Sequence, residues 1–275
     1  MTDVGTYALA SRHMEAAARE AGHTATRETP HVFTAGGVVF RRTSSSSLDA
    51  IRSTRDKAWC KERFQQANVP TPGEATGYPC IEKPVGGTGG AGVRILTRPT
   101  PPRPNTIREE LITGTLYRVF VAYGKAVATL RQTPAFVIGD GRSTVAALAA
   151  LKSRDRPTPT YAPIKVLPSL RDRIPAAGER VECHYLATRG IGADVTQTTN
   201  PRVEATAIKA VAAIPALHSG GVDLIQEETS RAVVLEVNSQ PHVQAHYAPQ
   251  AGVRKDPLRH LVLAALAGGR DQYGT

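Results

Sequence analysis

The chain has 275 residues, of which 41% are hydrophobic and 21% are charged, a composition typical of a globular protein with one large domain or two small ones. No run of 18 apolar residues occurs, so no membrane-spanning helix is predicted. Three widely separated cysteines without a CxxC pair indicate neither a zinc knuckle nor a disulfide framework, and we expect a reducing cytoplasm.

The net charge is +10 at pH 7. Such a charge suits a polyanionic partner or a site for nucleotides and acidic substrates. Because the basic residues are scattered and form no run, a solvated basic surface is favoured over a nucleic-acid partner. The charge also favours an acidic carboxylate substrate.

In the first part of the chain the pattern predicts two helices, at residues 6–21 and 55–67, and a short strand at 36–42. A strand over 78–84 enters a glycine-rich segment, and a strand over 93–97 leaves it. The stretches TSSSS and PTPPRPN predict loops.

Two hairpins follow along the chain. LYRVFVAYGKAVATLRQ alternates apolar and polar residues across a Tyr-Gly-Lys turn, and residues 221–228 and 231–238 form the second hairpin. Between the hairpins we expect a helix capped by Ser143 and another over 203–218, and the segment DPLRHLVLAALAG predicts a closing helix. Since the strands pair through hairpins with helices between them, the predicted fold class is α+β.

The segment EKPVGGTGGAGV, residues 82–93, places five glycines within seven positions. Glycine costs conformational entropy, so this density indicates that a phosphate approaches the backbone. The embedded GxGxxG does not open a helix, and no Gly-Lys-Ser/Thr follows, which argues against a Rossmann fingerprint and a Walker A loop. We expect a flap over a triphosphate; the alternative is a plain surface turn.

Oxygen-bearing side chains recur on the second hairpin. Asp223 lies on its first strand, and Glu236 and Asn238 lie two residues apart on its second strand. Residues i and i+2 share one face of a strand, so two carboxylates and an amide oxygen are predicted to converge. Such hard oxygens suit Mg²⁺ that also holds nucleotide phosphates. The alternative is simple exposure, but the apolar neighbours predict a buried sheet, where unpaired carboxylates are costly.

Four basic residues accompany these motifs: Lys57, Lys83, Arg118 and Arg131. Each alone could be a solvated charge, and only their combination with a phosphate loop and the three oxygen donors favours a nucleotide site. His242 and His246 follow the oxygen donors, and two histidines are too few for a zinc site.

Five stretches occur in a characteristic order: TRDKAWCKERFQQANVPTP, GYPCIEKPVGGTGGAGV, REELITGTLYRVFVAYGKAVATLRQTPAFVIGDGRSTVAAL, LATRGIGADVTQTTNP and GVDLIQEETSRAVVLEVNSQPHVQAHYAP. This order resembles the ATP-grasp carboxylate–amine ligases over residues 40–252. The closest patterns are the ATP-grasp modules of cyanophycin synthetase and of bifunctional glutathione synthetase. The 13-residue step from Asp223 to Glu236 is also similar to the metal hairpin of D-alanine–D-alanine ligases.

The resemblance implies a role for each matching residue. Lys57 and Lys83 would bind ATP phosphates, and Arg131 with Arg118 would stabilise the transferring phosphoryl group. The flap would consist of Gly87, Thr88, Gly89, Gly90 and Gly92. The hinge whose backbone pairs with adenine would consist of Glu109, Glu110, Leu111 and Ile112. Two Mg²⁺ ions, replaceable by Mn²⁺, would be held by Asp223, Glu236 and Asn238.

The family reaction joins a carboxylate to an amine through an acyl phosphate and releases ADP and phosphate. The resemblance therefore implies an ATP-dependent ligase for a small-molecule or peptide carboxylate and an amine. The implied fold has two α+β subdomains that clasp ATP, with residues 55–113 as the small lobe, 114–275 as the large lobe and 1–54 as a short N-terminal subdomain. A homodimer is one way in which so short a chain could complete its surface.

The chain departs from the family pattern around the substrate. Leu116 stands where relatives place an acid for the ribose, Tyr185 replaces an asparagine, the loop reads ATRG instead of STGG, and Pro241-His242 replaces Pro-Gly. Candidate substrate residues are Thr188, Arg189, His242 and His246. Two other classes remain open: an ATP-grasp kinase that releases a phosphorylated product, and a non-catalytic module that binds nucleotide or nucleic acid.

Overall fold

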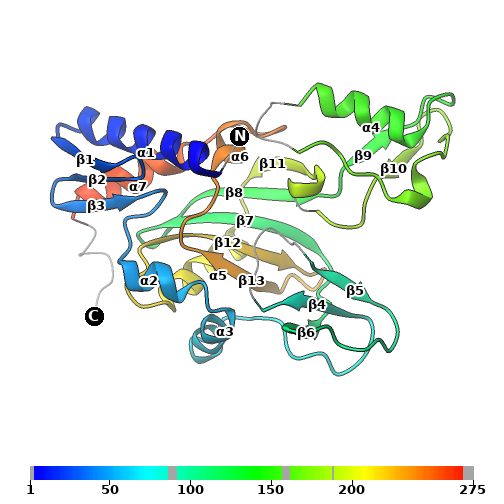
Figure 1. The fold of residues 1–275 in the computed structure, drawn as a ribbon, viewed down its shortest axis with the longest axis horizontal. Helices are drawn as coiled ribbons and strands as arrows, with labels where there is room; N and C mark the ends of the chain where they lie inside the picture. The colour runs from blue at the N-terminus through cyan, green and yellow to red at the C-terminus, as the bar shows by residue number, and fades with distance from the viewer. Residues whose placement is uncertain (1–2, 86–91, 157–161, 188, 269–275) are drawn as a thin grey trace.

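The structure, a computed structural model, describes residues 3–85, 92–156, 162–187 and 189–268. Its centre is an antiparallel sheet of five strands in the order β11-β8-β7-β12-β13 (Figure 1). These strands are β7 (Thr115–Ala122), β8 (Lys125–Thr133), β11 (Asp194–Thr198), β12 (Ser219–Gln226) and β13 (Ala232–Asn238). Both predicted hairpins and the α+β class are confirmed, whereas β11 was not predicted.

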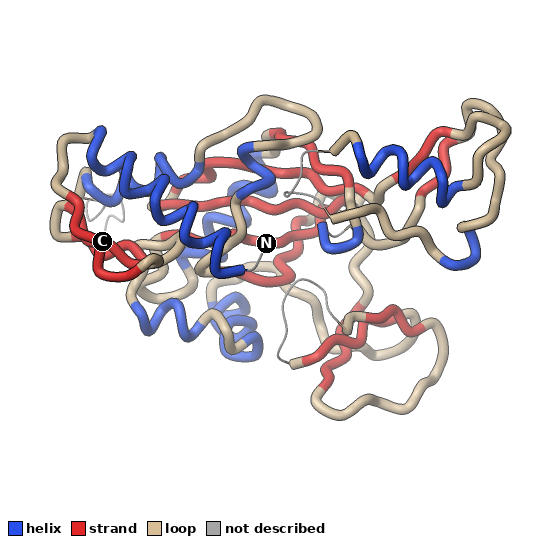
Figure 2. Tube along the Cα trace, turned by 45° about the horizontal axis from the view of Figure 1, so that its top comes forward, coloured by secondary structure: helices blue, strands red, loops and turns tan. Residues whose placement is uncertain are grey.

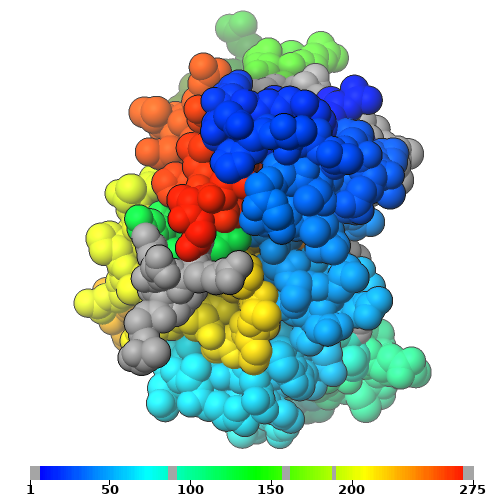
Figure 3. Space-filling view, turned by 90° about the vertical axis from the view of Figure 1, so that its left-hand side faces the viewer, coloured from blue at the N-terminus to red at the C-terminus, as the bar shows by residue number. Residues whose placement is uncertain are grey.

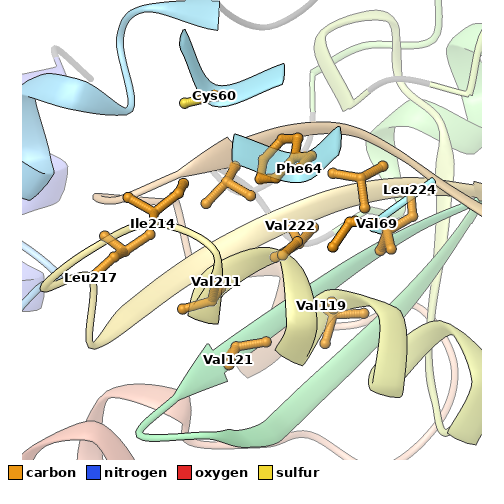
Figure 4. Close-up of a cluster of buried hydrophobic side chains, with 14 of the residues drawn as sticks. Cys60, Phe64, Val69, Val119, Val121, Val211, Ile214, Leu217, Val222 and Leu224 are labelled. Carbon is orange, nitrogen blue, oxygen red and sulfur yellow. The ribbon is translucent and has the colours of Figure 1, made fainter. Parts of the chain in front are cut away.

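One face of this sheet packs against two helices, α3 (Lys57–Gln66) and α5 (Pro201–Ala212). Val119 and Val121 of β7, Phe64 of α3 and Leu224 of β12 belong to the same buried cluster (Figure 4). Asp56 caps α3 by accepting hydrogen bonds from the N–H groups of its first turn, as the N-cap preference of aspartate predicts. Helix α3, which we assigned to the small lobe, thus packs on the central sheet.

The other face of the sheet is covered at one end by both ends of the chain. The elements are α1 (Asp3–Glu20), β1 (Ala25–Thr29), β2 (Val32–Ala35), β3 (Val38–Arg41) and α7 (Pro257–Leu266). Figure 3 shows the N-terminal segment in blue against the red residues of α7. Their apolar side chains form one cluster with Phe120 and Ala128 of the central sheet. The first strands, β1 and β2, were not predicted.

The loop TSSSS, residues 43–47, follows β3, and its first four residues are buried although all are polar. Burial is tolerated because their hydroxyls find partners on the large sheet and the segment after it. Thr43 donates to the carbonyl of Pro241 (3.1 Å), Ser45 bonds the Tyr123 hydroxyl (2.9 Å), and Ser46 accepts from the His218 N–H (2.9 Å). A short helix, α2 (Leu48–Ser53), then leads toward α3.

Figure 2 shows a small sheet that stands apart from the central one, and from here on we call this sheet the small lobe. Its strands pair in the order β5-β4-β6. Its strands are β4 (Cys80–Pro84), β5 (Arg94–Leu96) and β6 (Thr106–Glu110). The predicted strand–glycine segment–strand order is confirmed, because β4 pairs antiparallel with β5. Strand β6, with the sequence TIREE, was not predicted because its charged residues hide the strand pattern.

A further small unit extends from β8. It contains β9 (Phe136–Ile138), α4 (Val145–Arg154), two 3₁₀ turns, η1 (Pro168–Leu170) and η2 (Arg189–Ile191), and β10 (Arg180–Glu182). The predicted Ser143 cap is wrong, because Thr144 caps α4 by accepting from the Ala147 N–H. Asp140 instead accepts hydrogen bonds from both the backbone N–H and the hydroxyl of Ser143, which holds that residue in the preceding turn. The short helix α6 (Gln244–Tyr247) follows β13.

The core cluster on the α5 face gives the first prediction. Leu224 is fully buried there, so Leu224→Ala should lower the free energy of unfolding by about 2–5 kcal/mol, since it leaves a cavity in a packed core. Leu151→Ala on α4 is the matched control, because that side chain is 52% exposed and its loss should cost less than about 1 kcal/mol. Chemical denaturation measures both values. Equal losses in the two variants would contradict the assigned core.

Candidate active site

A cavity of about 1150 Å³ lies between the small lobe and the central sheet. Its walls come from α1, the junction of α2 and α3, the small lobe, β7, and the hairpin of β12 and β13 with the segment after it. The predicted site residues that line it are Lys57, Lys83, Glu109, Arg118, Asp223, Glu236, Asn238 and His242. The fold thus brings together residues that are up to 185 positions apart in the sequence, as Lys57 and His242 are.

The three oxygen donors converge because of the register of the second hairpin. Asp223 of β12 lies directly opposite Glu236 of β13, and Gly221 lies opposite Asn238. The ladder shifts by one residue after Asp223, so Leu235 is an extra residue on β13 and also reaches the cavity wall. Bulges of this kind re-aim side chains next to functional sites. All three donors therefore face the cavity, as the i, i+2 spacing predicted.

Each carboxylate of this group has a basic partner. Arg118 of β7 lies directly opposite Asp223 of β12 and donates two hydrogen bonds to its carboxylate, from Nε at 2.7 Å and from Nη2 at 2.6 Å. The Nζ of Lys57 lies 3.7 Å from Glu236, and the amide Nδ2 of Asn238 donates to the same carboxylate at 3.0 Å. A bidentate arginine is the strongest of these contacts because its fork matches the two carboxylate oxygens.

Burial raises the pKa of Glu236 above its usual 4.5, and the nearby charge of Asp223 raises it further. Hydrogen bonding by Asn238 and the charges of Lys57 and Arg118 act in the opposite direction. Two carboxylates placed side by side are well suited to a divalent cation, which would relieve the repulsion between their charges. Within the described ranges no three His, Cys, Asp or Glu side chains gather as a metal centre.

A second charged cluster joins the small lobe to α3. Lys83 of β4 and Lys61 of α3 both contact Glu109 of β6, at 2.5 Å and 3.2 Å. Glu109 is only 5% exposed, so its side chain fixes the two ammonium groups in the cavity wall. Lys61 was missed in the sequence, although its i, i+4 spacing from Lys57 on a helix places both lysines on one face.

Of the predicted hinge residues, only Glu109 lines the cavity. Glu110 accepts a hydrogen bond from the Gly73 N–H at 2.9 Å, and Ile112 is buried. Leu111 is half-buried between them.

Part of the predicted flap lies outside the described residues, namely Gly87, Thr88, Gly89 and Gly90, as does Thr188. Gly92, at the end of the segment, has a left-handed backbone with φ of 74°. A Cβ there would lie 2.9 Å from the Cγ of Pro84, so both the conformation and the space require glycine. The backbone of Arg189 begins η2, and the next residue, Gly190, lines the cavity.

The structure does not bring Arg131 to this site. Arg131 pairs with Tyr117 across the β7–β8 ladder, whereas Leu116 pairs with Gln132. Neighbouring residues of a strand face opposite ways, so Arg131 points to the side of the sheet on which α5 packs, away from the cavity. Its side chain is exposed to solvent there. The cavity-facing position belongs to Gln132, which lines the cavity beside Leu116.

Of the two predicted histidines, one lines the cavity and the other does not. His242 lines the cavity, and its ring lies 5.1 Å from the ring of Tyr7. His246 is buried away from the cavity wall, where its Nδ1 hydrogen-bonds the side-chain oxygen of Gln197 at 3.2 Å. Tyr185 is 55% exposed and does not line the cavity.

A buried carboxylate organises the opposite face of the small-lobe sheet. Glu82 of β4 is fully buried and accepts hydrogen bonds from Arg94 (2.9 Å), Arg103 (2.7 Å) and Arg108 (3.0 Å). Arg103 also donates to the carbonyl of Gly92 at 2.6 Å. One carboxylate thus ties β5, β6 and the end of the glycine segment to β4.

The overall fold matches solved structures over most of the chain. A bifunctional glutathione synthetase from Pasteurella multocida covers 94% of this chain with a TM-score of 0.68 at 20% identity, and this chain covers 44% of that one. D-alanine–D-alanine ligase from Bacillus anthracis covers 83% of this chain with a TM-score of 0.51 at 14% identity, and 72% of that chain is covered. At these identities the likeness shows the fold, which is ATP-grasp.

The sequence matches the same family. A profile of the ATP-grasp domain covers residues 54–243, which is more than half of the chain, so the chain belongs to the ATP-grasp family. Cyanophycin synthetase of Synechocystis sp. is 25% identical over 265 aligned positions, which span 78% of this chain and 30% of that protein. The bifunctional glutathione biosynthesis protein of Streptococcus mutans is 32% identical over 165 positions, which span 50% of this chain and 22% of that protein. The chain therefore covers less than a third of these curated relatives.

Among the described helices, none has both the length and the apolar content that a membrane crossing requires.

The Glu82 cluster gives the second prediction. Burial alone would raise the pKa of Glu82, but hydrogen bonds from Arg103, Arg108 and Arg94 lower it to about 2, below the usual 4.5. A depressed folded pKa means that ionised Glu82 stabilises the protein above about pH 4.5, and this contribution is lost as the pH falls toward about 2. Glu82→Gln should therefore be less stable than wild type at pH 7, by a margin that shrinks as the pH falls.

Urea denaturation at a series of pH values measures this margin. Glu62→Gln on the exposed side of α3 is the control and should show no such pH-dependent difference. A margin for Glu82→Gln that stays constant down to about pH 3 would contradict the ion-pair account.

Proposed function

We propose that this chain is the catalytic ATP-grasp module of an ADP-forming ligase that joins an amino acid or peptide carboxylate to an amine. One observation carries the proposal: the Lys83–Glu109–Lys61 cluster of the small lobe and the oxygen donors of β12 and β13 line one cavity. The first group suits the phosphates of a nucleotide, and the second suits the cations that accompany them. The relatives, which are named for cyanophycin and glutathione synthesis, support the same class.

The oxygen donors fit Mg²⁺, since a carboxylate pair and an amide give hard ligands and the raised pKa of Glu236 reflects carboxylate repulsion that a cation would relieve. Asp223, Glu236 and Asn238 would hold the ions, which would neutralise charge on the transferring phosphoryl group. Arg118 forms an ion pair with Asp223, so it would place a fixed positive charge beside the transferring phosphoryl group. The role implied for Arg131 has no support from its position on the α5 face.

In the proposed reaction an oxygen of the donor carboxylate attacks the γ-phosphorus of ATP, and ADP leaves. The amine nitrogen then attacks the acyl carbon, phosphate leaves with the bonding electrons, and the nitrogen loses a proton. Lys57, Lys61 and Lys83 would hold phosphate oxygens, so the protein acts mainly through positioning and charge stabilisation. A cavity that closes between two lobes would keep water from the acyl phosphate.

The reaction can be tested without knowledge of the amine. Hydroxylamine is a small amine nucleophile that would convert an acyl phosphate into a stable hydroxamate. Wild-type protein with Mg²⁺, ATP and hydroxylamine is incubated with pools of amino acids and dipeptides. ADP release with hydroxamate would support a ligase, ADP release with a stable phosphorylated product would support a kinase, and no release with any pool would contradict catalysis.

The third prediction concerns the oxygen donors. Asp223→Asn and Glu236→Gln should each lower Mg²⁺-dependent ADP release by about a hundredfold or more, because each weakens charge stabilisation worth several kcal/mol. Glu228→Gln, in the exposed turn of the same hairpin, is the control and should retain activity.

Without metal, Glu236→Gln should be more stable than wild type at neutral pH. The raised folded pKa means that ionisation of Glu236 destabilises the fold as the pH rises. Loss of activity together with this gain in stability identifies a functional carboxylate, whereas near-normal activity in both variants would refute the assignment.

The fourth prediction concerns the phosphate cluster. Lys83→Ala should weaken MgATP binding by at least about tenfold, since it removes a charge-assisted contact and leaves Glu109 with Lys61 alone. Lys125→Ala, at the exposed start of β8, is the control. Isothermal titration calorimetry measures both affinities, and an unchanged affinity in Lys83→Ala would place the phosphate site elsewhere.

A further inference from the structure

The end of the cavity beyond Asn238 is built largely by the N-terminal segment. Tyr7 of α1, Arg42 after β3, and Arg55 between α2 and α3 all line the cavity together with His242. Tyr7 and Arg42 lie before residue 54, where the match to the ATP-grasp domain begins. Tyr7 and Arg42 therefore come from outside the part of the chain that matches the domain profile, whereas Arg55 and His242 lie within it.

Hydrogen bonds hold the N-terminal segment against the residues that follow the metal hairpin. The Tyr7 hydroxyl donates to the carbonyl of Gln240 at 3.0 Å, and the side-chain amide of Gln240 donates to the carbonyl of Arg41 at 3.2 Å. Thr43 donates to the carbonyl of Pro241 at 3.1 Å and is buried. Residues on both sides of Arg42 are thus bonded to the segment that begins two residues after Asn238.

Arg42 itself is held in an uncommon conformation. Its φ is 54°, in the left-handed region, and its N–H donates to the carbonyl of His31 at 2.7 Å. A non-glycine residue in this region is strained and is often found at ligand-binding positions. Its guanidinium lies over the Tyr7 ring, 4.7 Å from the centroid. This cation–π contact restrains the guanidinium at the cavity wall.

The charges of the cavity are not balanced. Seven Lys and Arg side chains line it against four carboxylates. Lys57, Lys61, Lys83 and Arg118 pair with cavity carboxylates, and Arg108 pairs with Glu82. Among the described residues, neither Arg42 nor Arg55 forms an ion pair. MgATP with a second Mg²⁺ is close to neutral, so nucleotide binding would leave this excess in place.

We propose that Arg42, whose guanidinium lies over the Tyr7 ring, binds a second carboxylate of the donor together with Arg55. The donor substrate is then an acidic amino acid, free or within a peptide. The proposal rests on the proposed ligase function. One carboxylate would face the phosphate and metal groups, while the other would take charge-assisted hydrogen bonds from the guanidinium groups at the far end. Arginine suits this role better than lysine because its fork matches a carboxylate.

Binding is measured by calorimetry on the full chain saturated with Mg²⁺ and a non-hydrolysable ATP analogue. The probes are L-aspartate, L-glutamate and the glutamate dipeptide, each compared with its α-amide and its side-chain amides. Each amide of L-aspartate or L-glutamate retains only one carboxylate, so it cannot supply both the reacting carboxylate and the second carboxylate that Arg42 would bind. We expect at least one dicarboxylate probe to bind about tenfold or more tightly than its amides, and Arg42→Gln to remove that preference. Arg42→Lys should keep part of it.

Arg52→Gln on α2 is the matched control, because Arg52 is exposed and does not line the cavity. It should keep the preference, and all variants should keep the wild-type affinity for MgATP. Equal binding of acids and amides, no binding of any dicarboxylate, or an undiminished preference in Arg42→Gln would each overturn the proposal. A loss of MgATP affinity in Arg42→Gln would also overturn it, since the residue would then serve the nucleotide.

Hydroxamate formation with the same probes separates this inference from the proposed function. If the dicarboxylate preference depends on Arg42 but no hydroxamate forms, the subsite stands and the ligase proposal fails. If hydroxamate forms equally well from neutral donors in wild type and Arg42→Gln, the ligase stands and the subsite fails.

Discussion

Asp223 and Glu236 face each other across the β12–β13 ladder, and the cost of holding two carboxylates side by side shapes the rest of the cavity. Arg118 from β7 and Lys57 from α3 approach them, so the sheet, the hairpin and the helix all supply charge to one point. The raised pKa of Glu236 shows that these partners do not fully offset burial and repulsion. Such an arrangement in a cavity is the observation on which the proposed cation site rests.

The small lobe depends on the same principle. The described part of that lobe contributes little to the large apolar clusters, and its three strands are instead tied together by buried glutamates. Glu82 binds three arginines on one face, and Glu109 binds two lysines on the other. Charged groups therefore both hold this lobe together and line its cavity face.

Much of the central architecture could be predicted from the sequence, because the two hairpins alternate over long stretches and the period of a strand is unambiguous there. That period placed Glu236 and Asn238 on one face, and the register of the hairpin brings Asp223 opposite Glu236. The alternation of side chains did not suffice for Arg131. One step along a strand reverses the face of the sheet, and the sequence did not reveal which face of β8 lines the cavity. Strand β6 was hidden by its charged residues, and β10 has only three residues, too few for a pattern.

Long-range packing accounts for what remained hidden. Tyr7 and Arg42 reach the cavity only because α1 and β3 pack beside α7 at the opposite end of the chain. The sequence suggested His246 as a substrate residue, yet its ring forms a hydrogen bond with the side chain of Gln197 in the interior. Lys61 became visible as a site residue only through Glu109, whose strand the sequence did not predict.

The most direct measurement is a calorimetric titration of the wild-type protein with ATP in the presence of Mg²⁺, beside ATP without metal and beside NAD with Mg²⁺. The account predicts metal-dependent binding of ATP and no binding of NAD, because the cavity joins a phosphate cluster to oxygen donors for cations. Binding of NAD, or affinity for ATP that is unchanged when Mg²⁺ is removed, would contradict it.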